Sequence, residues 1–154
     1  MVVEKYWDDA RVGDEGVSPT MTVTGAMIDT YADLSGDRTP LHIDEEYAKK
    51  SHFGERVAHG LLGLSIASGL AMQMGFLDRT VEAFTSLDWK FRAPIKIGDT
   101  IFVEADVKEK KLAPGGAAGF VEFNVNVKNQ RGERVQRGTW MIVVKCKPKM
   151  ESGS

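Results

Sequence analysis

The sequence predicts an α+β protein in which one antiparallel β-sheet curls around a single central, buried α-helix. Residues 60–74 indicate the helix, because apolar side chains cover nearly every face of it. Four later stretches indicate the sheet, because apolar and polar residues alternate in them and turn residues separate them. A helix that is apolar all round needs a covering layer, and hairpin-connected strands provide one.

Length and composition indicate one globular domain. The chain has 154 residues, which suits a single core, so we assign 1–154 to one domain. We expect an irregular N-terminal arm over about 1–17 and a frayed tail at 149–154. The formal net charge is −2, without the concentrated Lys and Arg that nucleic acid binding requires. No apolar run is long enough to cross a membrane, and no signal peptide is evident at the start. We therefore expect a cytoplasmic protein with neither nucleic acid nor membrane as a partner.

The first half of the chain predicts a short strand followed by two helices. The strand covers 21–24, and a helical apolar spacing follows from Ala26 to Leu34. Thr24 can cap this helix and Gly36 can end it. A second helix over 44–50 begins with acidic residues and ends with lysines, which matches the helix dipole.

The second half predicts the four strands of the sheet. The alternating stretches are 87–91, 101–107, 121–127 and 135–146. Because one face of each of the first three stretches is apolar, we expect one face of the sheet to pack on the helix.

Asp37 and His42 are the candidate catalytic residues. They lie on either side of Thr39 and Pro40, just past the predicted end of the first helix, and the proline restricts the loop. A carboxylate and an imidazole held close together on a stiff loop suit general acid–base chemistry. The spacing alone equally fits an Asp that caps the loop and a His that bonds a backbone carbonyl.

The start of the apolar helix is a second candidate site. Unpaired N–H groups at a helix N-terminus can hold a developing oxyanion, and the missing side chain of Gly60 would let a substrate carbonyl approach. His59 also fits a capping or loop-packing role. Ser65 and Ser68 either bond to their own helix or face a pocket.

Metal and cofactor motifs are missing from the sequence. His42, Asp44 and His59 have no recognised ligand spacing, and the single cysteine, Cys146, excludes a cysteine cluster and an internal disulfide. The glycine-rich motifs that bind nucleotides do not occur. We therefore expect no metal and no bound cofactor.

Residues 31–48 resemble the hydratase 2 motif of the MaoC-like, (R)-specific enoyl-CoA hydratases. The matching positions are Leu34-Ser35-Gly36-Asp37, Pro40-Leu41-His42 and Ala48. The stretches 53–62, 91–94 and 98–99 are also similar to the family. The motif has Asn where this chain has Thr39, and a threonine offers one shorter hydroxyl in place of an amide.

This resemblance implies the hot-dog fold and a hydro-lyase of fatty acid metabolism that reversibly hydrates trans-2-enoyl thioesters to (R)-3-hydroxyacyl thioesters. The implied roles are catalytic for Asp37 and His42, oxyanion or substrate binding for Gly60, His59 and Ser68, and loop shaping for Thr39 and Pro40. Coenzyme A or acyl carrier protein would be part of the substrate, and the protein would form a homodimer. A hot-dog thioesterase and a non-catalytic acyl-thioester-binding protein remain as alternatives.

Overall fold

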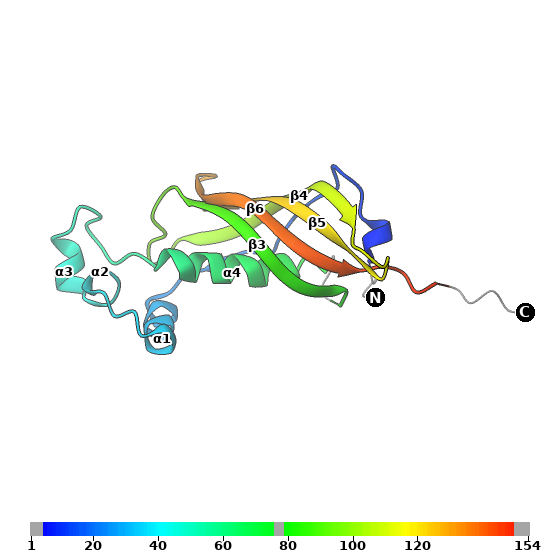
Figure 1. Cartoon of the computed structure of the whole chain (residues 1–154). Helices are drawn as coiled ribbons and strands as arrows, with labels where there is room; N and C mark the ends of the chain where they lie inside the picture. The colour runs from blue at the N-terminus through cyan, green and yellow to red at the C-terminus, as the bar shows by residue number, and fades with distance from the viewer. Residues whose placement is uncertain (1–4, 76–78, 150–154) are drawn as a thin grey trace, which may run out of the picture.

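The computed structural model describes residues 5–75 and 79–149 as a curved antiparallel sheet lying over one long helix (Figure 1). The helices are η1 (Trp7–Asp9), α1 (Gly25–Ser35), α2 (Pro40–Ile43), α3 (Glu45–Lys49) and α4 (Gly60–Met72). The strands are β1 (Glu15–Val17), β2 (Met21–Thr22), β3 (Val81–Phe91), β4 (Thr100–Leu112), β5 (Ala118–Lys128) and β6 (Arg134–Lys145). The strand order is β1-β4-β5-β6-β3, with β2 paired to β4. This is the predicted hot-dog arrangement, and the fold prediction is confirmed.

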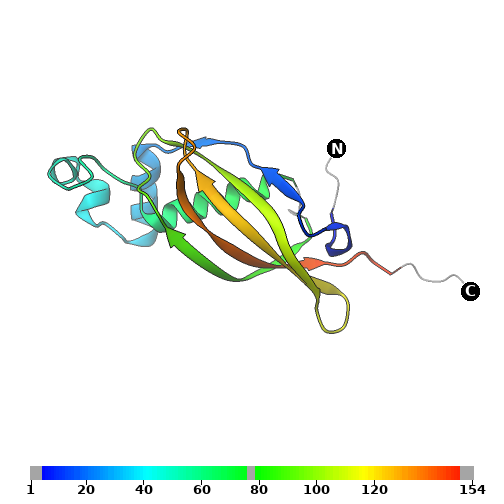
Figure 2. The same cartoon turned by 90° about the horizontal axis from the view of Figure 1, so that it is seen from above.

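The main core lies between α4 and the concave face of the sheet. On α4, Leu62, Ala67 and Leu70 are buried, and they belong to one cluster with Val103 of β4 and Trp140 of β6. Seen from above, the long strands cross α4 obliquely (Figure 2). Burial of these side chains is the main favourable contribution to the stability of the fold.

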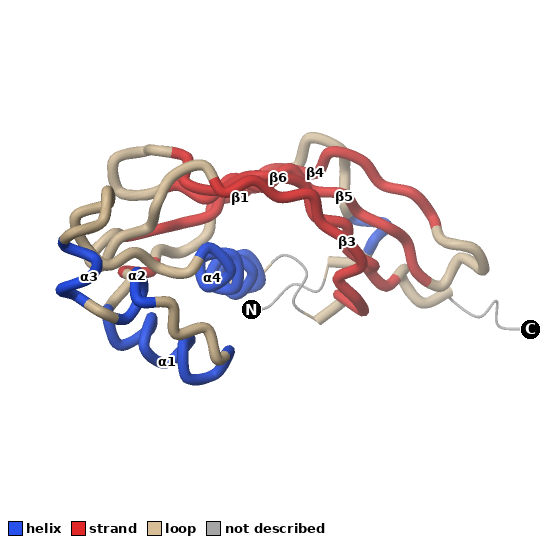
Figure 3. Tube along the Cα trace, turned by 60° about the vertical axis from the view of Figure 1, so that its left-hand side comes forward, coloured by secondary structure: helices blue, strands red, loops and turns tan. Residues whose placement is uncertain are grey.

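One side of α4 is not covered within this chain. The sheet lies on a single side of the helix (Figures 1 and 3). On the opposite side Leu61 is 59% exposed, and Ser65 and Gly69 are also exposed. The prediction that α4 is buried on all sides is therefore wrong for the isolated chain. Within the described ranges, no helix combines the length and apolarity needed to cross a membrane.

Helices α1, α2 and α3 gather at the end of the molecule where α4 begins, whereas η1 lies at the other end (Figures 1 and 2). The predicted limits of α1 are confirmed: Thr24 Oγ1 accepts a hydrogen bond of 3.2 Å from the backbone N–H of Met27, and Gly36 ends the helix with φ of 82°. The helix predicted over 44–50 corresponds to α3, which Asp44 caps. The sequence reasoning missed α2.

Two predictions about the sheet need correction. The arm predicted as irregular over about 1–17 contains η1 and the strand β1, which pairs with β4. Strand β3 begins at Val81, six residues before the predicted stretch, and contains two register shifts before Leu87. Of the tail predicted at 149–154, residues 150–154 lie outside the described residues.

Candidate active site

Asp37 lies in the loop between α1 and α2, and hydrogen bonds fix it at three points. Its backbone N–H donates to Ser35 Oγ over 3.1 Å, and its backbone carbonyl lies 2.9 Å from Nε2 of His59. Its Oδ1 accepts from the backbone N–H of Thr39 at 3.1 Å and from Oγ1 of Thr39 at 2.7 Å. Among the described residues no partner is found for Oδ2, so one carboxylate oxygen remains available.

His42 lies on α2 and is held at one ring nitrogen and at its backbone. Its Nδ1 is 2.8 Å from the backbone carbonyl of Val57. Because a carbonyl oxygen only accepts, Nδ1 carries the proton, and in the neutral ring Nε2 has the lone pair. Nε of Arg56 donates to the His42 carbonyl over 2.6 Å, which ties α2 to the segment before α4. His42 therefore presents a basic nitrogen on a fixed ring.

His59 is the third member of the group. Its side chain is buried, with 3% exposure, and its ring stacks on that of His42 with 4.0 Å between centroids. The ring also lies 4.7 Å from that of Tyr31. Because Nε2 faces the carbonyl of Asp37, it carries the proton, and no partner is found for Nδ1 among the described residues. His59 thus packs against the ring of His42 and holds the loop through the carbonyl of Asp37.

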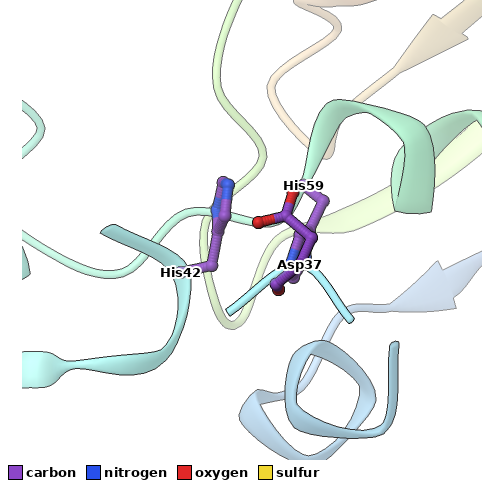
Figure 4. Close-up of side chains that lie close together, drawn as sticks. All are labelled: Asp37, His42 and His59. Atoms are coloured by element: carbon purple, nitrogen blue, oxygen red, sulfur yellow. The ribbon is translucent and has the colours of Figure 1, made fainter. Parts of the chain in front are cut away.

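The side chains of Asp37, His42 and His59 converge (Figure 4). One ligand-type atom from each lies within 4.8 Å of the others. Together the three side chains offer donor atoms of the kinds that bind a metal ion or hold a water by hydrogen bonds.

The pKa of the Asp37 carboxyl is lowered from its ordinary value. The largest cause is the hydrogen bond from the Thr39 side chain, followed by that from the Thr39 backbone. The imidazoles of His59 and His42 add a smaller lowering effect, which opposes the loss of solvation. Asp37 is therefore ionised at neutral pH and accepts hydrogen bonds there.

A cleft of about 340 Å³ opens beside His42 and the start of α4. Its lining includes His42, Gly60, Phe91 and Gln136. Gly60 is the first residue of α4, so its N–H has no partner within the helix. A Cβ at this position would lie 2.8 Å from the Phe91 ring, so the absence of a side chain makes room for that ring.

The predicted Ser68 is not among the residues that line this cleft. Its hydroxyl donates to the carbonyl of Ser65 over 2.7 Å, and the hydroxyl of Ser65 donates to the carbonyl of Leu61 over 2.8 Å. Both serines thus bond to their own helix. Among the described residues no hydrogen bond joins Ser68 to Asp37 or His42, so the oxyanion or substrate-binding role of Ser68 stays a prediction.

Two positioning residues escaped the sequence reasoning. Gln136 is buried, donates to the carbonyl of Gly60 over 3.1 Å and accepts from Nε1 of Trp89 over 2.9 Å. Arg56 bonds the carbonyl of His42 and also pairs with Asp29 of α1 at 2.5 Å. The only available signal for Gln136 was a polar residue in an otherwise apolar strand, and Arg56 had none.

A curved sheet over one helix is the arrangement of a hot-dog protein, and here a carboxylate and an imidazole lie near the N-terminal end of that helix. The sequence profile described as "MaoC like domain" matches residues 10–129. The chain belongs to this MaoC-like family.

Individual relatives agree with this assignment. Protein MaoC of Klebsiella aerogenes is 38% identical over 108 residues, which cover 70% of this chain and 32% of that protein. The (R)-specific enoyl-CoA hydratase of Rhodospirillum rubrum is 32% identical over 111 residues, which cover 70% of this chain and 75% of that enzyme. A solved MaoC-like dehydratase from Rhodospirillum rubrum superimposes with a TM-score of 0.85 at 30% identity, covering 94% of this chain and 99% of the other. This chain thus spans about a third of the Klebsiella protein's length.

Proposed function

We propose that this protein adds water reversibly to trans-2-enoyl thioesters and forms (R)-3-hydroxyacyl thioesters. The observation that carries the proposal is a pair of acceptors, Oδ2 of Asp37 and Nε2 of His42, that have no partner among the described residues, with His42 lining a cleft that also reaches Gly60 at the start of α4. The names of the relatives, hydratases and dehydratases of acyl thioesters, support the same reaction and its stereochemistry.

The proposed reaction begins with a water held between Asp37 and His42. The β-carbon of an α,β-unsaturated thioester is electrophilic, and the lone pair of Nε2 takes a proton from the water as its oxygen bonds to that carbon. The anionic carboxylate of Asp37 accepts a hydrogen bond from the second hydrogen of the water, which stays on the oxygen as the product hydroxyl, and it stabilises the imidazolium that forms. The imidazolium then gives its proton to the α-carbon, so the net change is the addition of one water molecule.

Negative charge develops on the thioester oxygen during the attack. The N–H of Gly60 is our candidate donor for this oxygen, because it lies at the start of α4 and lines the cleft with His42. The positive end of the helix dipole favours the same charge. The reaction needs no metal or redox cofactor, and coenzyme A or acyl carrier protein enters only as the carrier of the acyl group.

We further propose that two copies of the chain form a homodimer over the uncovered side of α4. Strand β3 is an edge of the described sheet, and Phe84, Leu87 and Phe91 on it are 44%, 45% and 53% exposed, while Leu61 on α4 is 59% exposed. Exposed apolar side chains on an edge strand favour association. Phe91 also lines the cleft, so a second copy would border the substrate site. Light scattering on the purified protein should give twice the chain mass.

The proposal is tested with crotonyl-CoA and a panel of longer and branched enoyl-CoAs. The wild-type protein should remove the enoyl absorbance, and chiral analysis should find the (R) product. Asp37→Asn keeps an acceptor for both Thr39 donors but cannot carry the charge, and His42→Ala removes the base. Each variant should retain the wild-type melting temperature and lose activity by about 10²–10⁴-fold, the range for a positioned acid–base group.

Other outcomes of the same assay would overturn the proposal. Release of free thiol without loss of the double bond would indicate a thioesterase. Tight binding of acyl-CoA without turnover across the panel would indicate a binding protein. Wild-type rates in both variants would refute the roles of Asp37 and His42.

A further inference from the structure

Thr39 stands where the related motif has asparagine, and its hydroxyl contacts the candidate catalytic carboxylate. We propose that Thr39 is a positioning residue that fixes Oδ1 of Asp37, so that Oδ2 is the oxygen that meets the reacting water. The inference rests on the function proposed above and assigns a task to the one motif residue that differs.

The geometry separates the two oxygens of the carboxylate. The Oγ1–H of Thr39 donates to Oδ1 over 2.7 Å, and the N–H of the same residue donates to Oδ1 over 3.1 Å. Both donors come from Thr39 and both bind Oδ1. Rotation of the carboxylate about the Cβ–Cγ bond of Asp37 would therefore break both hydrogen bonds. Because both bonds end on Oδ1, the direction of Oδ2 is set as well.

An ordinary capping role does not account for the Thr39 side chain. Thr39 is the N-cap of α2, yet its side chain forms no capping hydrogen bond. Pro40 follows at the first helical position and restricts the backbone of Thr39, which has φ of −54° and ψ of 128°. The hydroxyl of Thr39 bonds Asp37, two positions back along the chain.

His59 holds the same residue from the other side. Its Nε2–H donates to the backbone carbonyl of Asp37 over 2.9 Å, so the backbone is anchored independently of the carboxylate. Loss of the Thr39 hydroxyl should therefore loosen the carboxylate, which keeps only the backbone donor of Thr39, and leave the loop in place. This separation of side-chain and backbone anchors makes the inference testable.

The electrostatic effect of Thr39 runs in the same direction. Its two donors stabilise the ionised carboxylate and are the largest causes of the lowered pKa of Asp37. The other charged or titratable groups that act on Asp37 are His42 and His59, and the neighbouring Arg38 is paired with Asp33. Removal of the hydroxyl should raise the pKa of Asp37, because the two imidazoles and one backbone donor alone remain.

The test compares Thr39→Val, which keeps the branched shape but lacks the hydroxyl, with Thr39→Ser, which keeps the hydroxyl. In Thr39→Val, kcat should fall about tenfold with KM changed less than about twofold, since the group that reacts is misaligned while the cleft is intact. The side-chain ¹³C resonance of Asp37 should titrate at a higher pH than in the wild type. Thr39→Ser should restore both kcat and the low titration midpoint.

Two results would overturn the inference. An unchanged titration midpoint of Asp37 in Thr39→Val would show that the hydroxyl does not act on the carboxylate. A drop in melting temperature that accounts for the lost activity, with no recovery in Thr39→Ser, would show a purely structural role. The ¹³C titration does not depend on turnover, so it distinguishes failure of this inference from failure of the proposed hydratase activity, which the wild-type assay decides.

Discussion

Arg56 offers the sharpest test of how the site is held together. Its side chain is 15% exposed and joins two elements that carry the site: Nε–H bonds the carbonyl of His42 over 2.6 Å, and Nη2 pairs with Asp29 over 2.5 Å. Asp29 is 57% exposed, so solvent screens the ion pair. The bond to His42 should therefore dominate the contribution of Arg56.

The magnitudes follow from the two contacts. A hydrogen bond from a charged donor contributes about 1.5–3 kcal/mol, and an exposed ion pair contributes about 0.2–1 kcal/mol. Arg56→Ala should thus lower the free energy of unfolding by about 2–4 kcal/mol. It should also lower kcat, because His42 loses its backbone anchor. Asp29→Asn breaks only the ion pair and should lower the free energy of unfolding by about 0.2–1 kcal/mol with little change in kcat.

Urea denaturation and turnover of crotonyl-CoA measure the two effects. Arg56→Lys keeps the charge but cannot make both contacts with one planar group, so it should recover stability only in part. Equal losses in Arg56→Ala and Asp29→Asn would refute the reasoning, because the ion pair would then account for the whole effect. Unchanged kcat in a folded Arg56→Ala variant would show that His42 needs no anchor from Arg56.

Two further predictions concern packing and pH. An alanine at Gly63 would place its Cβ against Nε2 of Gln136 and 2.7 Å from Cδ1 of Ile95. Gly63→Ala should therefore lower the free energy of unfolding by about 1–3 kcal/mol, as measured by urea denaturation. An unchanged urea midpoint would contradict the tight contact. The pKa of Asp9 is lowered in the folded protein, chiefly by its hydrogen bond from Lys147. A carboxyl whose folded pKa is lowered stabilises the protein above its ordinary pKa of 3.8, and this stability is lost as the pH falls through the folded pKa. Lys147→Met should therefore be slightly less stable than the wild type at pH 7 and equally stable once Asp9 is protonated, and a difference that persists in acid would argue against this ion pair.

Residues close together in the sequence predicted those helices whose ends are set by nearby residues. Helix α1 begins at the Thr24 cap and ends at Gly36, and both contacts span only a few positions. Helix α2 was missed because four residues carry no period, although Pro40 at its first position was a usable signal. Strand β1 has three residues and becomes a strand only because β4 lies beside it.

The lining of the cleft is where sequence reasoning reached least far. Leu61, Leu62, Met72, Met74 and Phe84 are apolar and lie on or near α4 and β3, yet none of them lines the cleft beside His42. Met72 and Met74 instead border a separate cavity of about 50 Å³ at the far end of α4. Apolar side chains indicate burial, but the packing of distant strands decides which of them face a cavity.

The sequence by itself determined the Asp37-to-His42 loop, because the contacts that shape it join residues two or three positions apart, as between Asp37 and Thr39. Only the tertiary structure decided which atoms of that loop stay free to react. Val57, 15 positions from His42, takes one ring nitrogen of that residue, and His59, 22 positions from Asp37, takes its carbonyl. Contacts over such separations depend on how the α1–α2 region packs against the segment before α4, so no local pattern could reveal that, among the described residues, Oδ2 of Asp37 and Nε2 of His42 are left without a hydrogen-bond partner.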